Sequence, residues 1–250
     1  MNKILSAALL SLVFTNAASA ANITVSAAAS LKETFEAIGE LYENKYPDDS
    51  VDFNFGGSGA LYQQIKNGAP ADVFASADLK SMKDAEKSNL VLGDVATIFA
   101  KNDLVAIVPI DSKHTIKKLD DLKNNEFKQI AVGNPDTVPA GRYTNAALET
   151  AGVTESVKDK LIYSQNVRQV LEYVASNHVD IGFVYGTDAQ IQEGKKTKRV
   201  LEVELENPVL YPIAVLANSK EQKAAENFVD LVLSEEGQEI LQKAGFAKPD

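Results

Sequence analysis

Short apolar runs and longer amphipathic stretches alternate along almost the whole chain. Runs rich in β-branched and aromatic residues predict strands at 22–27, 51–55, 72–75, 103–109, 129–132, 161–163, 180–184 and about 209–216. Apolar positions recur at helical spacing over 31–46, 59–67, 79–88, 141–151, 155–160, 167–177, 187–192, 220–233 and 235–244. This alternation predicts an α/β fold, with mainly parallel sheets flanked by helices.

Two apolar runs, Leu104–Pro109 and Leu210–Leu216, flank a block of several strand–helix units. We expect the chain to leave a first lobe near residue 100, to build a second lobe and to return near residue 212. The first lobe then holds 21–102 plus 213–250, and the second holds 103–212. A cleft between the lobes, at the carboxyl ends of the strands, is where such sheets bind ligands.

The first 20 residues have the pattern of an export signal. Lys3 gives a basic start, Ile4–Phe14 form an apolar segment too short to span a bilayer, and Ala18-Ser19-Ala20 is a small-residue cleavage site. An amphipathic helix is the alternative, but the polar residues of this stretch share no face. We therefore expect cleavage after Ala20 and a soluble, periplasmic chain that does not insert into the membrane.

Composition narrows the classes of partner. The chain has no cysteine, which excludes disulfides, a lipid-modified cysteine and a thiolate metal site. Its formal net charge is −10, and loss of Lys3 with the signal makes the remainder more acidic still. This excess of acid argues against nucleic acid or an anionic membrane as partner. An anionic ligand must therefore be held by local dipoles rather than by bulk charge.

Two strand-to-helix junctions in the first half of the chain have features of anion sites. After the first strand, Ser30 and Glu33 have the Ser-x-x-Glu spacing of a capping box at the start of a helix, whose free N–H groups attract anions. Phe53–Leu61 run from a strand through a glycine-rich turn, where Ser58 can cap the next helix and offer its hydroxyl. This turn is not a Walker loop, because it lacks Gly-Lys-Ser/Thr, and it is not a nucleophile elbow, because Ala60 occupies a required glycine position.

Three further junctions lie in the second half. Pro139 and Gly141 shape a turn in which the Ala140 N–H can point outward at a helix start. Arg142 lies beyond that turn, and we expect it on the helix face, directed away from these N–H groups. Two more donors are the Val167 N–H, at another strand-to-helix junction, and the hydroxyl of Tyr185, at the tip of a buried strand. Each junction taken alone is also typical of an ordinary turn.

Taken together, these motifs resemble the periplasmic molybdate-binding proteins that feed ABC transporters, across essentially all of residues 21–250. The resemblance rests on Ala-Ala-Ala-Ser-Leu at 27–31, Phe-Gly-Gly-Ser-Gly at 55–59, Gly-Ala-Pro-Ala-Asp-Val-Phe at 68–74, Val-Pro-Ala-Gly at 138–141, Asn-Val-Arg at 166–168 and Val-Tyr-Gly-Thr-Asp at 184–188. It implies the type II periplasmic-binding-protein fold, with two α/β lobes hinged around a ligand cleft.

The resemblance also implies a set of oxyanion donors. These are the hydroxyls of Ser30, Ser58 and Tyr185 and the backbone N–H groups of Ala140 and Val167. Backbone N–H groups of the two serines are further candidates. We expect no cofactor and no direct cation ligand, an inner-membrane ABC permease as partner, and a monomer.

The chemistry of these donors predicts selectivity. All are neutral, and fully deprotonated molybdate or tungstate accepts hydrogen bonds from every direction. Hydrogen phosphate carries a proton that such a pocket leaves unpaired, at a cost of about 1–3 kcal/mol. Sulfate passes this protonation test and must be excluded by its smaller size. A receptor for sulfate or another tetrahedral oxyanion therefore remains the alternative.

Two other classes of protein fit the sequence less well. An exported hydrolase would pair Ser30 or Ser58 with His114 or His178, but both histidines lie in polar, loop-like contexts. We therefore expect no enzymatic activity. The effector domain of a transcription regulator shares the expected fold but conflicts with an export signal. The basic run Lys195–Arg199 is expected to be an exposed loop.

Overall fold

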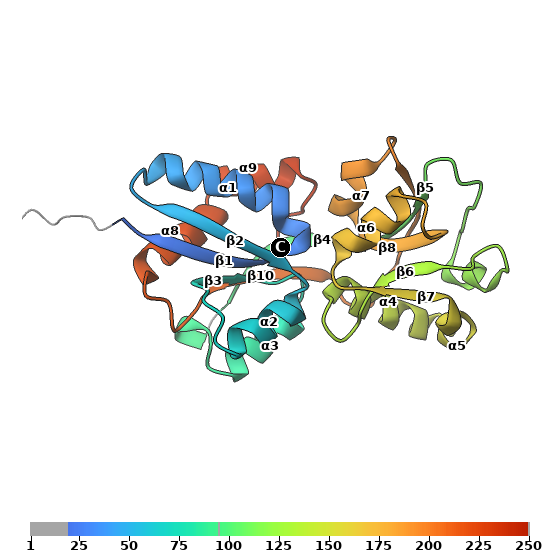
Figure 1. Cartoon of the computed structure of the whole chain (residues 1–250), viewed down its shortest axis with the longest axis horizontal. Coiled ribbons are helices and arrows are strands. Elements are labelled where there is room, and N and C mark those ends of the chain that lie inside the picture. The colour runs from blue at the N-terminus through green and yellow to red at the C-terminus, as the bar shows by residue number, and fades with distance from the viewer. Residues whose placement is uncertain (1–19, 95, 250) are drawn as a thin grey trace, which may run out of the picture.

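The computed structural model describes residues 20–94 and 96–249, so all but the last residue of the predicted export signal lies outside the described residues. The described chain forms two lobes side by side, each a five-stranded sheet with helices on both faces (Figure 1). The predicted two-lobed α/β architecture is therefore confirmed. No helix in the described part of the chain is long and apolar enough to cross a bilayer.

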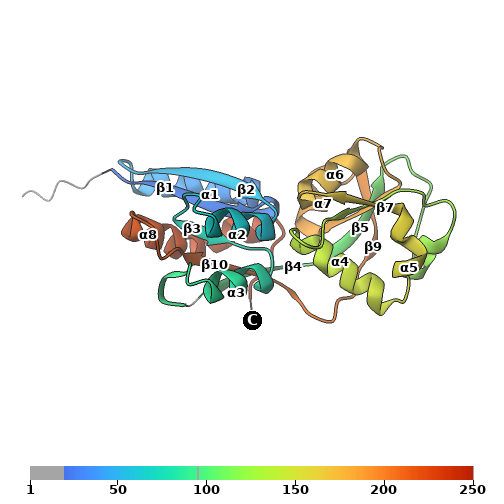
Figure 2. The ribbon, with the colours of Figure 1, turned by 60° about the horizontal axis from the view of Figure 1, so that its bottom comes forward.

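Lobe I contains the first part of the chain and its C-terminal end. Its strand order is β2-β1-β3-β10-β4, with bounds Asn22–Ala28 for β1, Ser50–Gly56 for β2, Val73–Ala75 for β3, Thr97–Asn102 for β4 and Val209–Val215 for β10. Helices α1 (Lys32–Lys45), α8 (Gln222–Leu233) and α9 (Glu235–Lys243) cover one face. Helices α2 (Ser58–Lys66) and α3 (Leu79–Lys87) cover the other, and a 3-10 turn occupies Leu92–Asp94 (Figure 2).

Lobe II has the strand order β7-β6-β8-β5-β9. The bounds are Leu104–Pro109 for β5, Ile130–Gly133 for β6, Leu161–Ser164 for β7, Ile181–Tyr185 for β8 and Thr197–Glu202 for β9. Helices α6 (Val167–Ala175) and α7 (Gly186–Gln192) lie on one face, and α4 (Pro139–Thr150) and α5 (Thr154–Val157) lie on the other. Short 3-10 turns occupy Leu119–Lys123 and Lys158–Lys160.

One strand in each sheet runs against the others, and it is the strand that enters from the other lobe. β10 is antiparallel to β3 and β4, and β5 is antiparallel to β8 and β9. Asp103 alone links β4 to β5, and residues 203–208 carry the chain back from β9 to β10. The return therefore comes before residue 209, ahead of the boundary between 212 and 213 expected from the sequence. Residues 209–212 already pair with β4.

Aromatic packing fixes the interior of lobe I. Phe35 of α1 is fully buried, and its ring centroid lies 5.8 Å from that of Phe99 and 5.9 Å from that of Phe228. These three rings join α1, β4 and α8, which are far apart in the sequence. The helix face and the sheet face thus share one apolar core, which holds the carboxyl ends of the strands in place.

The structure adds two strands that the sequence pattern did not predict, β4 and β9. The prediction that Lys195–Arg199 form an exposed loop is wrong for residues 197–199. β9 begins at Thr197, and this threonine is fully buried. β9 is an edge strand paired only with β5, so its outer positions carry charged side chains. Edge strands often carry such residues, which conceal the strand pattern in the sequence.

Candidate functional site

Ser30 lies in a 3-10 turn (Ala29–Leu31) between β1 and α1, rather than at a helix cap. The predicted capping box is wrong: Leu31 occupies the N-cap position of α1, and no side chain caps this helix. The Ser30 Oγ instead lies 3.0 Å from the Tyr211 Oη, and Glu33 turns toward Arg168 of lobe II. The tight turn points the hydroxyl toward the sheet, where β10 supplies the tyrosine.

Ser58 is the first residue of α2, and Gly57 takes the cap position that the sequence assigned to the serine. The Ser58 side chain is fully buried, and its Oγ accepts a hydrogen bond from the Ala77 N–H at 3.0 Å. A hydroxyl has one proton to donate in addition to its acceptor sites. The contact with Ala77 therefore fixes the oxygen and leaves the Ser58 proton for another acceptor.

The two predicted backbone donors lie at helix starts in lobe II. Val167 is the first residue of α6, and Asn166 caps this helix by accepting from the Gln169 N–H at 3.0 Å. Ala140 is the second residue of α4, after a proline that has no N–H. First-turn N–H groups have no acceptor within their own helix. Ala140 and Val167 are both less than 5% exposed, so these groups lie inside the protein.

Tyr185 ends β8, and its hydroxyl reaches into lobe I. Its Oη donates to the Ala77 carbonyl at 3.4 Å, so Ala77 contacts Ser58 through its N–H and Tyr185 through its C=O. Burial raises the pKa of Tyr185 well above its ordinary value, which keeps the hydroxyl protonated. Tyr185 therefore retains its donor proton throughout the physiological pH range.

The lobes touch where these groups meet. The Gly59 N–H of lobe I donates to the Thr137 carbonyl of lobe II at 2.9 Å. A Cβ on Gly57 would lie 2.9 Å from the carbonyl oxygens of Thr137 and Gln165. The starts of α2, α4 and α6 therefore converge at one point between closed lobes. We call the five groups of Ser30, Ser58, Ala140, Val167 and Tyr185 the donor cluster; all five residues are less than 5% exposed.

Three residues beside the donor cluster were not predicted: Ala77, Asn102 and Tyr211. The Asn102 amide donates to the Tyr211 Oη at 3.3 Å and to the Thr187 Oγ1 at 2.9 Å. Tyr211 lies in an apolar segment that predicts a strand, where a tyrosine is expected to be a core residue. The sequence around it therefore did not indicate a contact with Ser30. Asn102 and Ala77 follow no motif and were found only through their contacts.

Both arginines near the donor cluster are already paired with carboxylates. Arg142 donates to Asp78 through its Nε at 2.7 Å and to the Pro135 carbonyl, just before α4, at 3.1 Å. Arg168 pairs with Glu33 and with Asp188. Burial alone would raise the pKa of Glu33, but the hydrogen bonds and charge of Arg168 outweigh it and hold this pKa below its usual value.

Asp188 is fully buried, and burial raises its pKa to about 6 despite the opposing charge of Arg168. One of its oxygens pairs with Arg168, while its Oδ2 has no hydrogen-bond partner within the part of the chain that the structure describes. A buried carboxylate beside an anion site would repel the anion. Arg168 offsets this charge locally.

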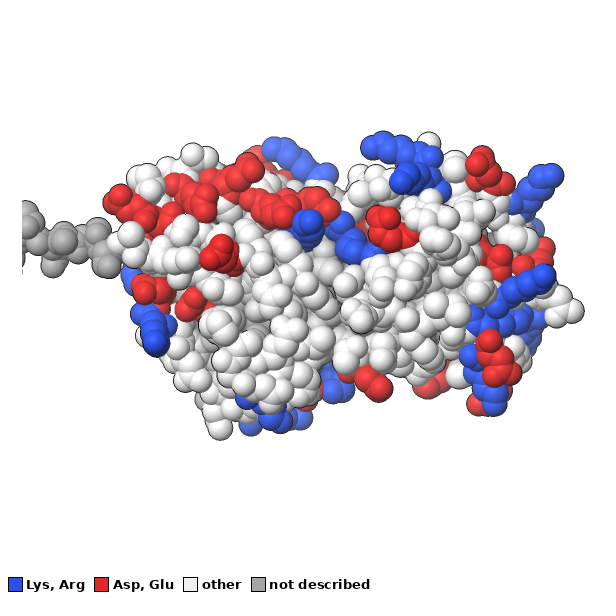
Figure 3. Space-filling view, viewed as in Figure 1, with Lys and Arg blue, Asp and Glu red and all other residues white. Residues whose placement is uncertain are grey.

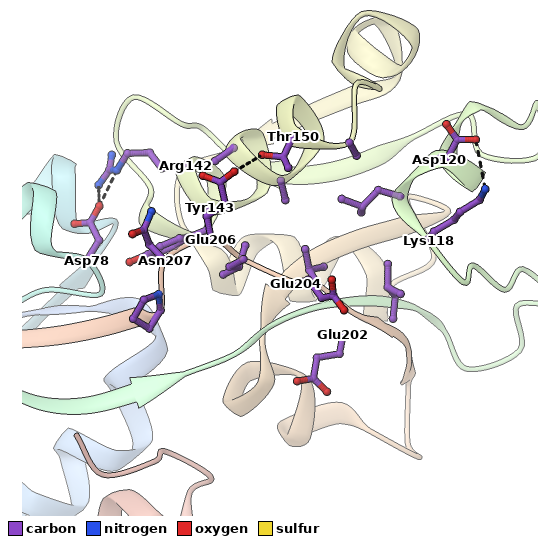
Figure 4. Close-up of a pocket in the computed structure, with 18 of the residues that line it drawn as sticks. Asp78, Lys118, Asp120, Arg142, Tyr143, Thr150, Glu202, Glu204, Glu206 and Asn207 are labelled. Atoms are coloured by element: carbon purple, nitrogen blue, oxygen red, sulfur yellow. Dashed lines mark hydrogen bonds and ion pairs between the residues drawn. The ribbon is translucent and has the colours of Figure 1, made fainter. Parts of the chain in front are cut away.

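A groove of about 860 Å³ lies beside the donor cluster rather than at it. Its walls come from α4, the start of α3, residues 117–120, the end of β9 and the return segment 203–208 (Figure 4). Arg142 reaches across one end of the groove to Asp78. Another side is lined by Glu202 of β9 and by Glu204 and Glu206 of the return segment. Around the lobes, acidic side chains gather over α1 in lobe I (Figure 3). The walls of this groove carry charged side chains of both signs.

The geometry does not support a serine hydrolase. Ser30 contacts Tyr211 and Ser58 contacts Ala77, whereas His114 lies beside Phe127 and 3.4 Å from a Glu126 oxygen. Within the described residues, no three His, Cys, Asp or Glu side chains gather in a way that could hold a metal ion. Among the described residues, the two serines are thus held by a tyrosine hydroxyl and a backbone N–H rather than by a histidine.

Comparison with known proteins places this arrangement in a family. The profile of bacterial extracellular solute-binding proteins matches residues 23–247. The chain belongs to this family. Its relatives are proteins that bind solutes, and the family includes components of ABC transporters.

Individual relatives match over most of their length. The chain is 35% identical over 228 residues to the putative ABC transporter substrate-binding lipoprotein YvgL of Bacillus subtilis, covering 90% of this chain and 85% of that protein. It is 32% identical over 235 residues to the molybdate-binding protein ModA of Haemophilus influenzae, covering 92% and 91%. Among solved structures, the substrate-binding domain of a putative molybdenum ABC transporter from Clostridium difficile has a TM-score of 0.68 and 37% identity, covering 92% of this chain and all of that one.

Proposed function

We propose that this protein binds molybdate, and tungstate in the same way, in the periplasm and delivers it to an ABC importer. The ligand would be held between the lobes by the donor cluster. The two serine hydroxyls and the Ala140 and Val167 amides would each donate to a ligand oxygen, and the Tyr185 hydroxyl would turn its proton from the Ala77 carbonyl to the ligand. The names of two relatives, the molybdate-binding protein and the molybdenum transporter domain, support this choice of ligand.

One observation carries the proposal: neutral donors converge from both lobes, while the nearby arginines are paired with carboxylates. Ser58 and Tyr185 both contact Ala77, and Arg142 and Arg168 bind Asp78 and Glu33. A dianion without protons needs donors only. Each hydrogen bond to a charged oxygen contributes about 1.5–3 kcal/mol, so five of them support tight binding after the cost of closing the lobes.

The ligand is tested by comparing four oxyanions. We expect molybdate and tungstate to raise the melting temperature of the purified protein, because a ligand that binds only the folded state stabilises it. Phosphate should have no effect, since its proton would find no acceptor. Sulfate is the most informative comparison, because it is also a dianion without protons and differs from molybdate in size. A larger shift with sulfate than with molybdate would replace the proposed ligand with the smaller oxyanion.

The site residues are tested by removing single hydroxyls. Ser30→Ala and Ser58→Ala should each weaken molybdate binding in calorimetric titration, by about tenfold or more per lost charged hydrogen bond. Ser156→Ala is a matched control, because Ser156 is exposed on α5 in lobe II. Affinities equal to that of the control would remove these serines from the site.

Export is supported by the position of Ala21. Ala21 is buried, and its backbone N–H donates to the Asp49 Oδ1 at 3.0 Å. Cleavage after Ala20 would turn this N–H into an ammonium group that the same carboxylate can bind. Mass spectrometry of the periplasmic fraction should therefore find a mature chain that starts at Ala21, and we expect size-exclusion chromatography to show a monomer. A mature chain that starts elsewhere would exclude this cleavage site.

A further inference from the structure

Two arginines of lobe II cross the gap between the lobes and bind carboxylates of lobe I. Arg142 of α4 reaches Asp78 at the start of α3, and Arg168 of α6 reaches Glu33 of α1. Both arginines follow a predicted amide donor closely in the sequence: Arg142 comes two residues after Ala140. Formation of these ion pairs is therefore geometrically linked to the approach of the donor cluster.

The Arg142–Asp78 pair is the more buried one. The Arg142 Nη2 lies 2.6 Å from the Asp78 Oδ2, and the two side chains are 18% and 6% exposed. The Arg142 Nη2 also donates to the Ser81 Oγ at 2.8 Å, so the guanidinium binds two groups of α3. Within its own lobe, Arg142 is held by the Pro135 carbonyl at 3.1 Å.

The Arg168–Glu33 pair is bidentate. The Nη1 and Nη2 atoms of Arg168 lie 2.6 Å and 2.5 Å from the two oxygens of Glu33. The Arg168 Nη2 also donates to the Ser30 carbonyl at 3.4 Å, next to a predicted ligand hydroxyl. Within lobe II, the Arg168 Nε pairs with the buried Asp188. Paired planar groups of this kind give geometric specificity as well as energy.

We propose that Arg142–Asp78 and Arg168–Glu33 are two latches that form when the lobes close and that set how long the oxyanion stays bound. The inference rests on the proposed function. The four residues are positioning residues, because they act on the lobes rather than on the ligand. Each arginine has partners within its own lobe, so it is already oriented when the lobe I carboxylate arrives. Pre-orientation lowers the entropy cost of forming the pair.

The latches are tested by removing charge from the lobe I partners. Asp78→Asn keeps the helix cap that Asp78 provides to the Ser81 N–H, because asparagine is an equally good cap residue. Glu33→Gln preserves the size of an exposed side chain. The matched controls are Asp84→Asn on α3 and Glu36→Gln on α1. The Asp84 carboxylate binds Lys80 of its own helix, and Glu36 is exposed.

The main readout is the dissociation rate of molybdate in stopped-flow experiments. We expect Asp78→Asn to raise this rate about tenfold and Glu33→Gln about threefold, since the Asp78 pair is less exposed to solvent. The association rate should change by less than twofold, and the melting temperature without ligand should match the controls. Dissociation rates within twofold of the control variants would overturn the proposal.

A second readout does not depend on the ligand. Because the chain has no cysteine, Asn44→Cys in lobe I and Ser156→Cys in lobe II can be labelled selectively for energy transfer. We expect the latch variants to shift the label distances toward a more open form than the controls. If the wild-type protein fails to bind molybdate, the proposed function is wrong. The label distances then test by themselves whether the two ion pairs hold the lobes closed. Identical distance distributions in latch and control variants would then overturn them.

Discussion

The hydroxyl oxygens of Ser30 and Tyr211 lie 3.0 Å apart, although 181 positions separate the two residues in the chain. The Asn102 amide already donates to the Tyr211 oxygen, so the tyrosine satisfies its buried proton best by donating to Ser30. Ser30 then accepts from Tyr211 and keeps its own proton free. Ser58 has the same arrangement, with the Ala77 N–H as its fixed donor. Both serines are thereby oriented as donors toward the cleft.

Tyr211→Phe tests this orientation. Loss of the hydroxyl leaves Ser30 free to rotate, and we expect molybdate affinity to fall about three- to tenfold, as for the loss of one ordinary hydrogen bond. Asn102 keeps its contact with Thr187, so the fold should change little. Tyr62→Phe is the matched control, because the Tyr62 hydroxyl contacts only Ser88 within lobe I. Titration calorimetry showing equal affinity for both variants would contradict the assignment.

Gly57→Ala tests whether binding requires closed lobes. The added Cβ would lie 2.9 Å from two carbonyl oxygens, both of them in lobe II, so it obstructs closure without disturbing lobe I. We expect molybdate affinity to fall more than tenfold while the melting temperature without ligand is unchanged. Gly186→Ala is the control, because its Cβ would meet no atom closer than 3.6 Å. Unchanged affinity in the Gly57 variant would show that binding does not depend on this contact.

The raised pKa of Asp188 predicts that the stability of the protein depends on pH. Burial raises its pKa to about 6 in the folded protein, against 3.8 for the free side chain. Between these values the folded state holds a proton that the unfolded state has released, so the free energy of unfolding falls as pH rises. The slope is at most about 1.4 kcal/mol per pH unit, and the effect ends above the folded pKa.

This pH effect is measured by urea unfolding at pH 4 to 7. The wild-type protein should lose stability relative to Asp188→Asn as pH rises from about 4 to about 6, and the difference should be constant above that. The variant is the reference because asparagine does not titrate. A difference that is flat across the whole range, or that grows with pH, would contradict the raised pKa.

Gly141→Ala tests the close packing of α4 on β6. A Cβ at this position would lie 2.0 Å from the Gly133 carbonyl oxygen, and a backbone atom cannot move aside as a flexible side chain can. We expect the free energy of unfolding to fall by about 3 kcal/mol or more. Ala146→Ser, at an exposed position of the same helix, should be neutral. Urea denaturation of both variants checks this, and equal stability would refute the packing constraint.

The sequence located nearly every element because each has a strong local signal. The run from Ile23 to Ala28 and the helical spacing from Lys32 onward depend on side-chain pattern alone, and the structure reproduces both within a residue or two. Where local signals were weak, prediction failed. β4 and β9 are edge strands, and their lysine, arginine and threonine residues interrupt the apolar pattern by which a strand is recognised.

In the candidate site, too, residues with a local sequence signal were predicted and their distant partners were not. Glycine, proline and serine at strand-to-helix junctions marked Ser30, Ser58, Ala140 and Val167 on local grounds, because helix starts need such residues. The partners of these groups could not be predicted, because they come from distant strands: Tyr211 reaches Ser30 only through the return of β10 to lobe I.

The sequence by itself thus indicated every strand except β4 and β9, and with its family resemblance it indicated the two-lobed class and the candidate donors. Only the tertiary structure decided whether each serine hydroxyl has its proton free to donate, and which carboxylate binds each arginine. These choices depend on contacts between residues that belong to different elements, from 19 positions apart for Ser58 and Ala77 to 181 positions apart for Ser30 and Tyr211. No local pattern encodes such contacts, because they arise from the packing of separate elements within a lobe and of one lobe against the other.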